Sequence, residues 1–190
     1  HGNAGLMGSD RVSGAAPVPR PFLAATALES TWVPPEGHSP IVFLAPWCLR
    51  FGRRQVWEPG RRSVVGDPWA GADVRGTGEE RLRALIDRTL EALARALGAA
   101  HGERWTPREV RLLLGPWLFS YLAAQMDRWE RLQLAVTHHP GLFAWGFPME
   151  RAACPADTLE AVQWLKGDPY NLQLMTPAME ALGIEVRSCG

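Results

Sequence analysis

The sequence predicts a helix-rich α/β domain in which a small sheet is flanked by helices. Two observations lead to this class: apolar residues recur at helical spacing after residue 77, and short continuous apolar runs occur near both ends of the chain. Hydrophobic residues make up 46% of the 190 positions and charged residues 21%, which is typical of a globular protein. No apolar run reaches the roughly 18 residues of a membrane span, so we expect no transmembrane segment.

Charge and cysteine usage exclude several function classes. Lys+Arg and Asp+Glu are both 20, and this balance argues against a nucleic-acid-binding protein. Lys166 is the single lysine, so an anion site would rely mainly on guanidinium groups. Cys48, Cys154 and Cys189 lie far apart without zinc-ligand spacing. We therefore expect free thiols, a cytoplasmic location, no metal and no cofactor.

The N-terminal third contains two strand candidates and a long loop. Residues 1–20 lack periodicity and are expected to form a flexible lead before a single domain at 21–190. Residues 21–28 read as a short strand or the start of a helix. Residues 41–45 (IVFLA) are the strongest strand candidate, because the run is continuous and apolar and is followed by Pro46. Residues 50–76 are rich in Gly, Pro and Trp and predict an irregular loop.

Four helices are predicted, at 77–98, 106–136, 157–167 and 168–183. The first two begin with the capping-box patterns Thr77–Glu80 and Thr106–Glu109. The pair 115–116 (Gly-Pro) is expected to kink or break the second helix, and the pair 176–177 (Thr-Pro) to kink or restart the fourth. Residues 184–188 read as a final short strand.

Arginines form the first candidate binding group. They follow the strongest predicted strand, and ligands of open α/β sheets bind near strand carboxyl ends. Guanidinium groups there would bind a diphosphate or a carboxylate through paired hydrogen bonds. The alternative is a solvated basic loop, which is the commoner outcome for a run of charge. The candidates are Arg50, Arg53, Arg54, Arg61 and Arg62.

Tryptophans form the second group. Aromatic faces stack on sugars and bases, whereas the alternative is packing in the core. The candidates are Trp47, Trp57, Trp69 and Trp105, while Trp117 is assigned to the core.

Histidine and a charged helical pair complete the candidates. His101 lies in the predicted interhelical loop and is a candidate general base, although an exposed or structural role is the alternative. Asp127 and Arg128, late in the second predicted helix, are the charged pair. Asp127 and Arg131 are four residues apart, which indicates helix support, with a buried pair that contacts ligand as the alternative. The sequence contains no phosphate-binding loop, dinucleotide fingerprint, nucleophile elbow or zincin motif.

Five segments together resemble one family, the large transferases encoded in bacterial surface-polysaccharide gene clusters. The segments are PFLAATALESTW, IVFLAPWCLRF, HGERWTPREVRLLLGPWL, QMDRWERL and DPYNLQLMT, and the GPWL and YNLQL blocks are the most specific. The similarity spans about residues 22–182. It differs from the family pattern at Ala25, Ala45, Pro46 and Met175, and Pro46 stands where the family has Glu.

This resemblance implies a glycosyltransferase-like fold of two Rossmann-type lobes. Because family members are much longer, the chain would be an N-terminal, Rossmann-like partial lobe with a small parallel sheet flanked by helices. The family has no assigned catalytic residues to carry over. The positions that match its motifs are Thr26, Glu29, Trp32, Trp47, Cys48, Trp69, His101, Trp105, Gly115, Pro116, Trp117, Asp127, Arg128, Asn171 and Gln173.

The first functional hypothesis is the acceptor-side part of a glycosyltransferase-like enzyme in bacterial surface-glycan synthesis. Its partners would be a nucleotide-sugar co-substrate, a glycan acceptor and a C-terminal lobe, without which we expect the chain to be inactive. His101 or Glu29 would be the base, and the arginines would stabilise the leaving diphosphate. Asp127, Arg128 and Asn171 join the predicted substrate-binding set. The alternative is a stand-alone, non-catalytic domain that binds glycan or protein; a phospho-ligand or nucleic-acid binder is the third hypothesis.

Overall fold

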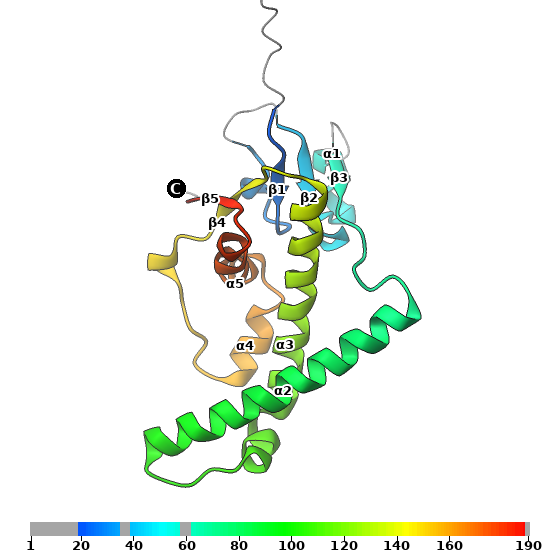
Figure 1. Ribbon diagram of the computed structural model, residues 1–190. Helices are drawn as coiled ribbons and strands as arrows, with labels where there is room; N and C mark the ends of the chain where they lie inside the picture. The colour runs from blue at the N-terminus through cyan, green and yellow to red at the C-terminus, as the bar shows by residue number, and fades with distance from the viewer. Residues whose placement is uncertain (1–18, 35–38, 58–61, 189–190) are drawn as a thin grey trace, which may run out of the picture.

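The structure is a computed structural model that describes residues 19–34, 39–57 and 62–188 (Figure 1). It confirms the predicted class, because a small parallel sheet is flanked by helices. The strands are β1 (Phe22–Ala24), β2 (Ile41–Phe43), β3 (Arg62–Val64), β4 (Phe143–Gly146) and β5 (Glu185–Ser188).

The sheet has the order β3-β2-β1-β4-β5, and every neighbouring pair is parallel. From β1 the chain first extends the sheet through β2 and β3, and then returns to add β4 and β5 on the other side. The strand order therefore reverses between β1 and β4. In open parallel sheets this reversal opens a crevice at the carboxyl ends of the strands, where ligands bind.

Two long helices and three shorter ones surround or extend from this sheet. They are α1 (Arg54–Trp57), α2 (Ala72–His101), α3 (Pro107–His138), α4 (Thr158–Trp164) and α5 (Asp168–Ala181). Single 3-10 turns occupy Glu29–Thr31, Pro46–Cys48, Phe51–Arg53 and Met149–Arg151. Helices α2 and α3 pack against each other as a hairpin that extends away from the sheet (Figure 1).

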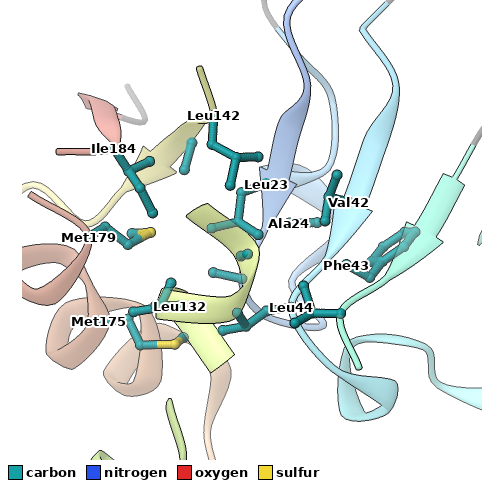
Figure 2. Close-up of a cluster of buried hydrophobic side chains, with 14 of the residues drawn as sticks. Leu23, Ala24, Val42, Phe43, Leu44, Leu132, Leu142, Met175, Met179 and Ile184 are labelled. Atoms are coloured by element: carbon teal, nitrogen blue, oxygen red, sulfur yellow. The ribbon is translucent and has the colours of Figure 1, made fainter. Parts of the chain in front are cut away.

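The main core lies between the sheet and helices α3 and α5. Leu132 of α3 and Met175 and Met179 of α5 point towards Leu23 of β1 and Ile184 before β5 (Figure 2). All five are at most 4% exposed. Burying a side chain of this size stabilises the fold by about 1.5–3 kcal/mol. This packing fixes α3 and α5 against the strands whose ends form the site described below.

The helical hairpin has a smaller core of its own. Leu90 of α2 packs with Val110 and Leu118 of α3, at the helical spacing that the sequence shows. The capping box at Thr106 is confirmed, since its hydroxyl accepts from the Glu109 amide while the Glu109 carboxylate accepts from the Thr106 amide.

Helix α3 continues through Pro116, so of the two predicted outcomes the break does not occur. The carbonyl that loses its partner belongs to Leu112, which is 75% exposed and therefore open to water. Two local predictions were wrong. Helix α2 begins at Ala72, so Thr77 lies inside the helix rather than at its N-cap, which is Gly71 at φ 120°. Strand β3 lies within the stretch predicted to be an irregular loop. Strand β4 was not predicted.

Candidate functional site at the strand ends

A pocket of about 370 Å³ lies at the carboxyl ends of β1 and β2, next to the reversal of strand order. Helix α3 and the junction between α4 and α5 complete its wall. The pocket is lined by Thr26, Ala27, Trp47, Arg50, Ala124, Asp127, Arg128, Leu165, Lys166, Asp168 and Asn171.

The turn after β1 contributes Thr26 and Ala27 to the pocket lining. Two hydrogen bonds hold this turn in place. The carbonyl of Thr26 accepts from the indole N–H of Trp32 at 2.8 Å, and Trp32 is 5% exposed. The backbone N–H of Ala27 donates to Asp168 at 3.1 Å. Asp168 is the first residue of α5, so this bond joins the end of β1 to the start of a helix 141 residues later.

Asp168 also pairs with Arg50, which follows the turn after β2. The Asp168 side chain is 16% exposed whereas that of Arg50 is 59% exposed. One carboxylate therefore orients a backbone amide and an exposed guanidinium at the pocket rim. Charge-assisted bonds of this kind are about twice as strong as neutral ones.

Arg131 of α3 does not line the pocket but connects its own helix to the segments that follow β2 and β3. Its guanidinium is 3.2 Å from the carboxylate of Asp127 and 3.3 Å from both the Gly66 carbonyl and the Asp67 carboxylate. It also lies 4.9 Å from the ring centre of Trp47. Arg131 is only 8% exposed, so its guanidinium is held within the fold and fixes the positions of Asp127 and Trp47.

Arg128 is the cation with spare hydrogen-bonding capacity. Its Nη2 donates to the side-chain oxygen of Asn171, but its Nη1 is buried and has no partner in the part of the chain that the structure describes. Burial lowers the pKa of the guanidinium, while neighbouring Asp127 opposes that shift. The group remains charged, because an arginine pKa lies so far above neutral. A buried N–H without a partner favours a ligand that supplies an acceptor.

Lys166 is the third cation of the pocket and makes no ion pair with any described residue. Arg50, Arg128 and Lys166 thus face two carboxylates, Asp127 and Asp168, of which Asp127 is also paired with Arg131. The lining therefore carries an excess of positive charge, with an exposed aromatic ring beside it. This combination suits an anionic group such as a phosphate or a carboxylate.

The predicted arginine group is dispersed in the structure. Arg50 alone of its four described members lines the pocket. Arg53 forms a paired contact with Glu29, Arg54 lies over the ring of Phe51, and Arg62 lies over the ring of Trp57. Arg61 lies outside the described residues.

The predicted tryptophans have different environments. Trp47 lines the pocket and is 43% exposed. Trp69 does not line it, but its indole N–H donates to Asp127 at 2.7 Å and so positions a lining carboxylate. Trp57 donates to the carbonyl of Arg50, and Trp105 packs in the core of the helical hairpin.

Neither predicted base lies in the pocket lining. His101 is exposed at the end of α2, beside the loop that joins the two long helices. The Glu29 carboxylate accepts from Nε of Arg53 at 2.6 Å and from Nη2 of Arg53 at 2.5 Å. This bonding lowers the pKa of the Glu29 carboxyl group. A carboxylate with a lowered pKa accepts a proton less readily than an unpaired one.

Of the predicted residues, the structure brings together Trp47, Arg50, Asp127, Arg128 and Asn171 in one pocket. Sequence reasoning missed Lys166 and Asp168 as site residues. Lys166 could have been singled out because it is the one lysine of the chain. Asp168 could have been singled out because it is the first residue of a helix and precedes Pro169. Arg131 was read as helix support, and its additional contacts with Gly66 and Trp47 required the fold.

The described residues contain neither a metal-binding cluster nor a membrane-spanning helix. Within them, no group of three or more His, Cys, Asp or Glu side chains is arranged to bind a metal ion. Among the helices of the same residues, none combines the length and the apolar character needed to cross a membrane.

Comparison with known proteins identifies the family. A family model described as LIC12162 family transferase matches residues 21–189, which include all five strands and all five α-helices. No curated protein and no solved structure matches the chain. Since the match covers most of the sequence, the chain belongs to the LIC12162 family of transferases.

Proposed function

We propose that this transferase chain is the acceptor-side, N-terminal part of a glycosyltransferase-like enzyme of bacterial surface-glycan synthesis. In this proposal the strand-end pocket contacts the diphosphate of a nucleotide-sugar whose nucleoside is held by the C-terminal lobe. The observation that supports it is the buried, unpartnered Nη1 of Arg128 beside Lys166 and Arg50. A diphosphate supplies several oxygen acceptors and the negative charge that this lining favours.

The proposed reaction is the transfer of a sugar to an acceptor hydroxyl. The hydroxyl oxygen bonds to the anomeric carbon while the bond to the diphosphate breaks, and the diphosphate leaves with the electron pair. Arg128, Lys166 and Arg50 would stabilise the charge that develops on it. Asp168 accepts from Arg50 and the Ala27 amide, and Asp127 accepts from Arg131 and the Trp69 indole, so the role of the two carboxylates is to position these four groups. The pocket thus supplies leaving-group stabilisation, and the proton of the acceptor hydroxyl would pass to a base on the C-terminal lobe.

Ligand titration followed by thermal unfolding tests this proposal. Pyrophosphate, nucleoside diphosphates and nucleotide-sugars at millimolar concentration should raise the melting temperature, because they bind only the folded state. Arg128→Ala should weaken this binding about 10- to 100-fold, the equivalent of one charge-assisted bond. Arg83→Ala is the matched control, because Arg83 is exposed on α2 and, among the described residues, forms an ion pair with Glu79 alone, one turn away.

Two results would count against the proposal. No shift with any of these ligands, in a protein that melts cooperatively, would remove the diphosphate site. An equal shift in the Arg128 and Arg83 variants would place the anion elsewhere. Binding of glycans without any nucleotide binding would instead support the non-catalytic glycan-binding domain.

A further inference from the structure

A second pocket, of about 360 Å³, differs from the strand-end pocket in its chemistry. None of its eight lining residues is charged. Two aromatic rings, Trp164 and Tyr170, form part of its wall, with their centres 5.4 Å apart and their planes at 71°. This edge-to-face arrangement leaves ring faces that the partner ring does not cover.

Neutral polar groups accompany these rings. The Trp164 indole N–H, the Tyr170 hydroxyl and the Gln163 amide form no hydrogen bond with another described residue. The Gln173 amide, by contrast, is engaged in two bonds with the backbone of Ala153, at 2.9 and 3.1 Å. Gln173 thereby anchors the segment around Ala153 to helix α5. The pocket is therefore uncharged and mainly apolar, with a few neutral donors and acceptors beside its aromatic rings.

Helix α5 separates this pocket from the strand-end pocket. Asp168 and Asn171 line the strand-end pocket, whereas Pro169, Tyr170 and Gln173 line the uncharged one. At 3.6 residues per turn these two sets lie on opposite faces of the first turns of α5. A nucleotide with its diphosphate at Arg128 would have to pass around the helix to place its base against Trp164. The uncharged pocket is therefore suited to a separate ligand.

We infer that the uncharged pocket binds an uncharged sugar ring of the glycan acceptor, an inference that rests on the proposed glycosyl transfer. A pyranose has an apolar C–H face that packs on an aromatic ring and hydroxyl groups that exchange hydrogen bonds with neutral side chains. An anion would find no cation in this lining. The apolar face of a sugar would pack on its aromatic rings, and the sugar hydroxyls would bond the neutral groups of Gln163, Trp164 and Tyr170. The lining thus matches a neutral ligand with one apolar face.

Saturation-transfer NMR of the full chain with methyl glycosides of glucose, galactose, rhamnose and N-acetylglucosamine tests the inference. We expect millimolar binding of at least one glycoside, weakened about fivefold or more in Trp164→Ala through loss of the stacking ring. Tyr170→Phe keeps the ring pair and removes the hydroxyl, so it tests the same site if the alanine variant does not fold. Trp129→Phe is the control, because Trp129 lies on α3 and does not line this pocket.

The glycoside-binding result can be interpreted whether or not the strand-end pocket binds a diphosphate. Glycoside binding that persists in Arg128→Ala but weakens in Trp164→Ala or Tyr170→Phe supports the inference, even if nucleotides fail to bind. The inference is overturned if no glycoside binds, if both pocket variants bind as the wild type does, or if nucleosides rather than glycosides lose binding in those variants.

Discussion

Replacing Arg131 with Met tests whether the buried guanidinium organises the strand ends. Methionine preserves most of the apolar volume, so the loss falls on polar contacts. The bond to Asp127 is charge-assisted and buried on the arginine side, and such bonds contribute about 1.5–3 kcal/mol. Stacking on the partly exposed ring of Trp47 adds about 0.5–1 kcal/mol. The contact with Asp67 adds little, because that carboxylate is 57% exposed. We therefore expect the free energy of unfolding to fall by about 2–4 kcal/mol.

Urea unfolding followed by circular dichroism measures this loss. Asp67→Asn is the internal comparison and should cost less than about 1 kcal/mol, because it removes the exposed partner alone. The double variant Arg131→Met/Asp127→Asn should show a coupling energy above about 0.5 kcal/mol, since these two groups are in direct contact. A loss below about 1 kcal/mol in Arg131→Met, with no coupling to Asp127, would refute the argument that Arg131 organises this end of the sheet.

Three further predictions concern other parts of the chain. Because Arg53 lowers the pKa of Glu29 in the folded state, the stability contributed by this pair is present above the usual glutamate value of 4.5 and is lost as the pH falls below it. The difference in stability between wild type and Glu29→Gln should therefore disappear on acidification, and a constant difference would contradict this. Burial raises the pKa of Cys48 to about 12, so iodoacetamide at pH 8 should alkylate exposed Cys154 and leave Cys48 unmodified until the protein unfolds, as peptide mass mapping would show. Gly146→Ala should destabilise by about 1–3 kcal/mol in urea unfolding, because the new Cβ would lie 2.2 Å from a side-chain carbon of β5; an unchanged unfolding midpoint would show that the strands separate without cost.

The helices were predictable because their signals are local. The capping box at Thr106 and the histidines that end α3 lie within a few residues of the boundaries they mark. The start of α2 was missed because the capping-box pattern at Thr77 lies inside the helix, which begins at Ala72. Strand β4 was missed because its sequence FAWG is short and ends in glycine, and only pairing with β1 and β5 identifies it.

The candidate site was predictable in part, because its residues come from segments far apart in the sequence. Trp47 and Arg50 follow the strongest strand and could be placed at a strand end by rule. Asp127 and Arg128 were candidates as a charged helical pair, whereas Asn171 entered the predicted set through the family motifs. No local pattern indicates that α3 and α5 meet at the end of β1. The arginine group is dispersed because its members contact different neighbouring groups. Arg53 pairs with a carboxylate, and Arg54 and Arg62 each lie over an aromatic ring.

Both pockets depend on the position of one helix. The apolar face of α5, with Leu172, Met175 and Met179, is buried against the sheet, so the helix cannot rotate without opening the core. Its first turn then presents Asp168 to the charged pocket and Tyr170 to the uncharged one. The bond from the Ala27 amide to Asp168 fixes this turn against the end of β1. The spacing between a bound anion and a bound sugar would therefore be set by core packing rather than by loop conformation, as positioning two substrates for transfer requires.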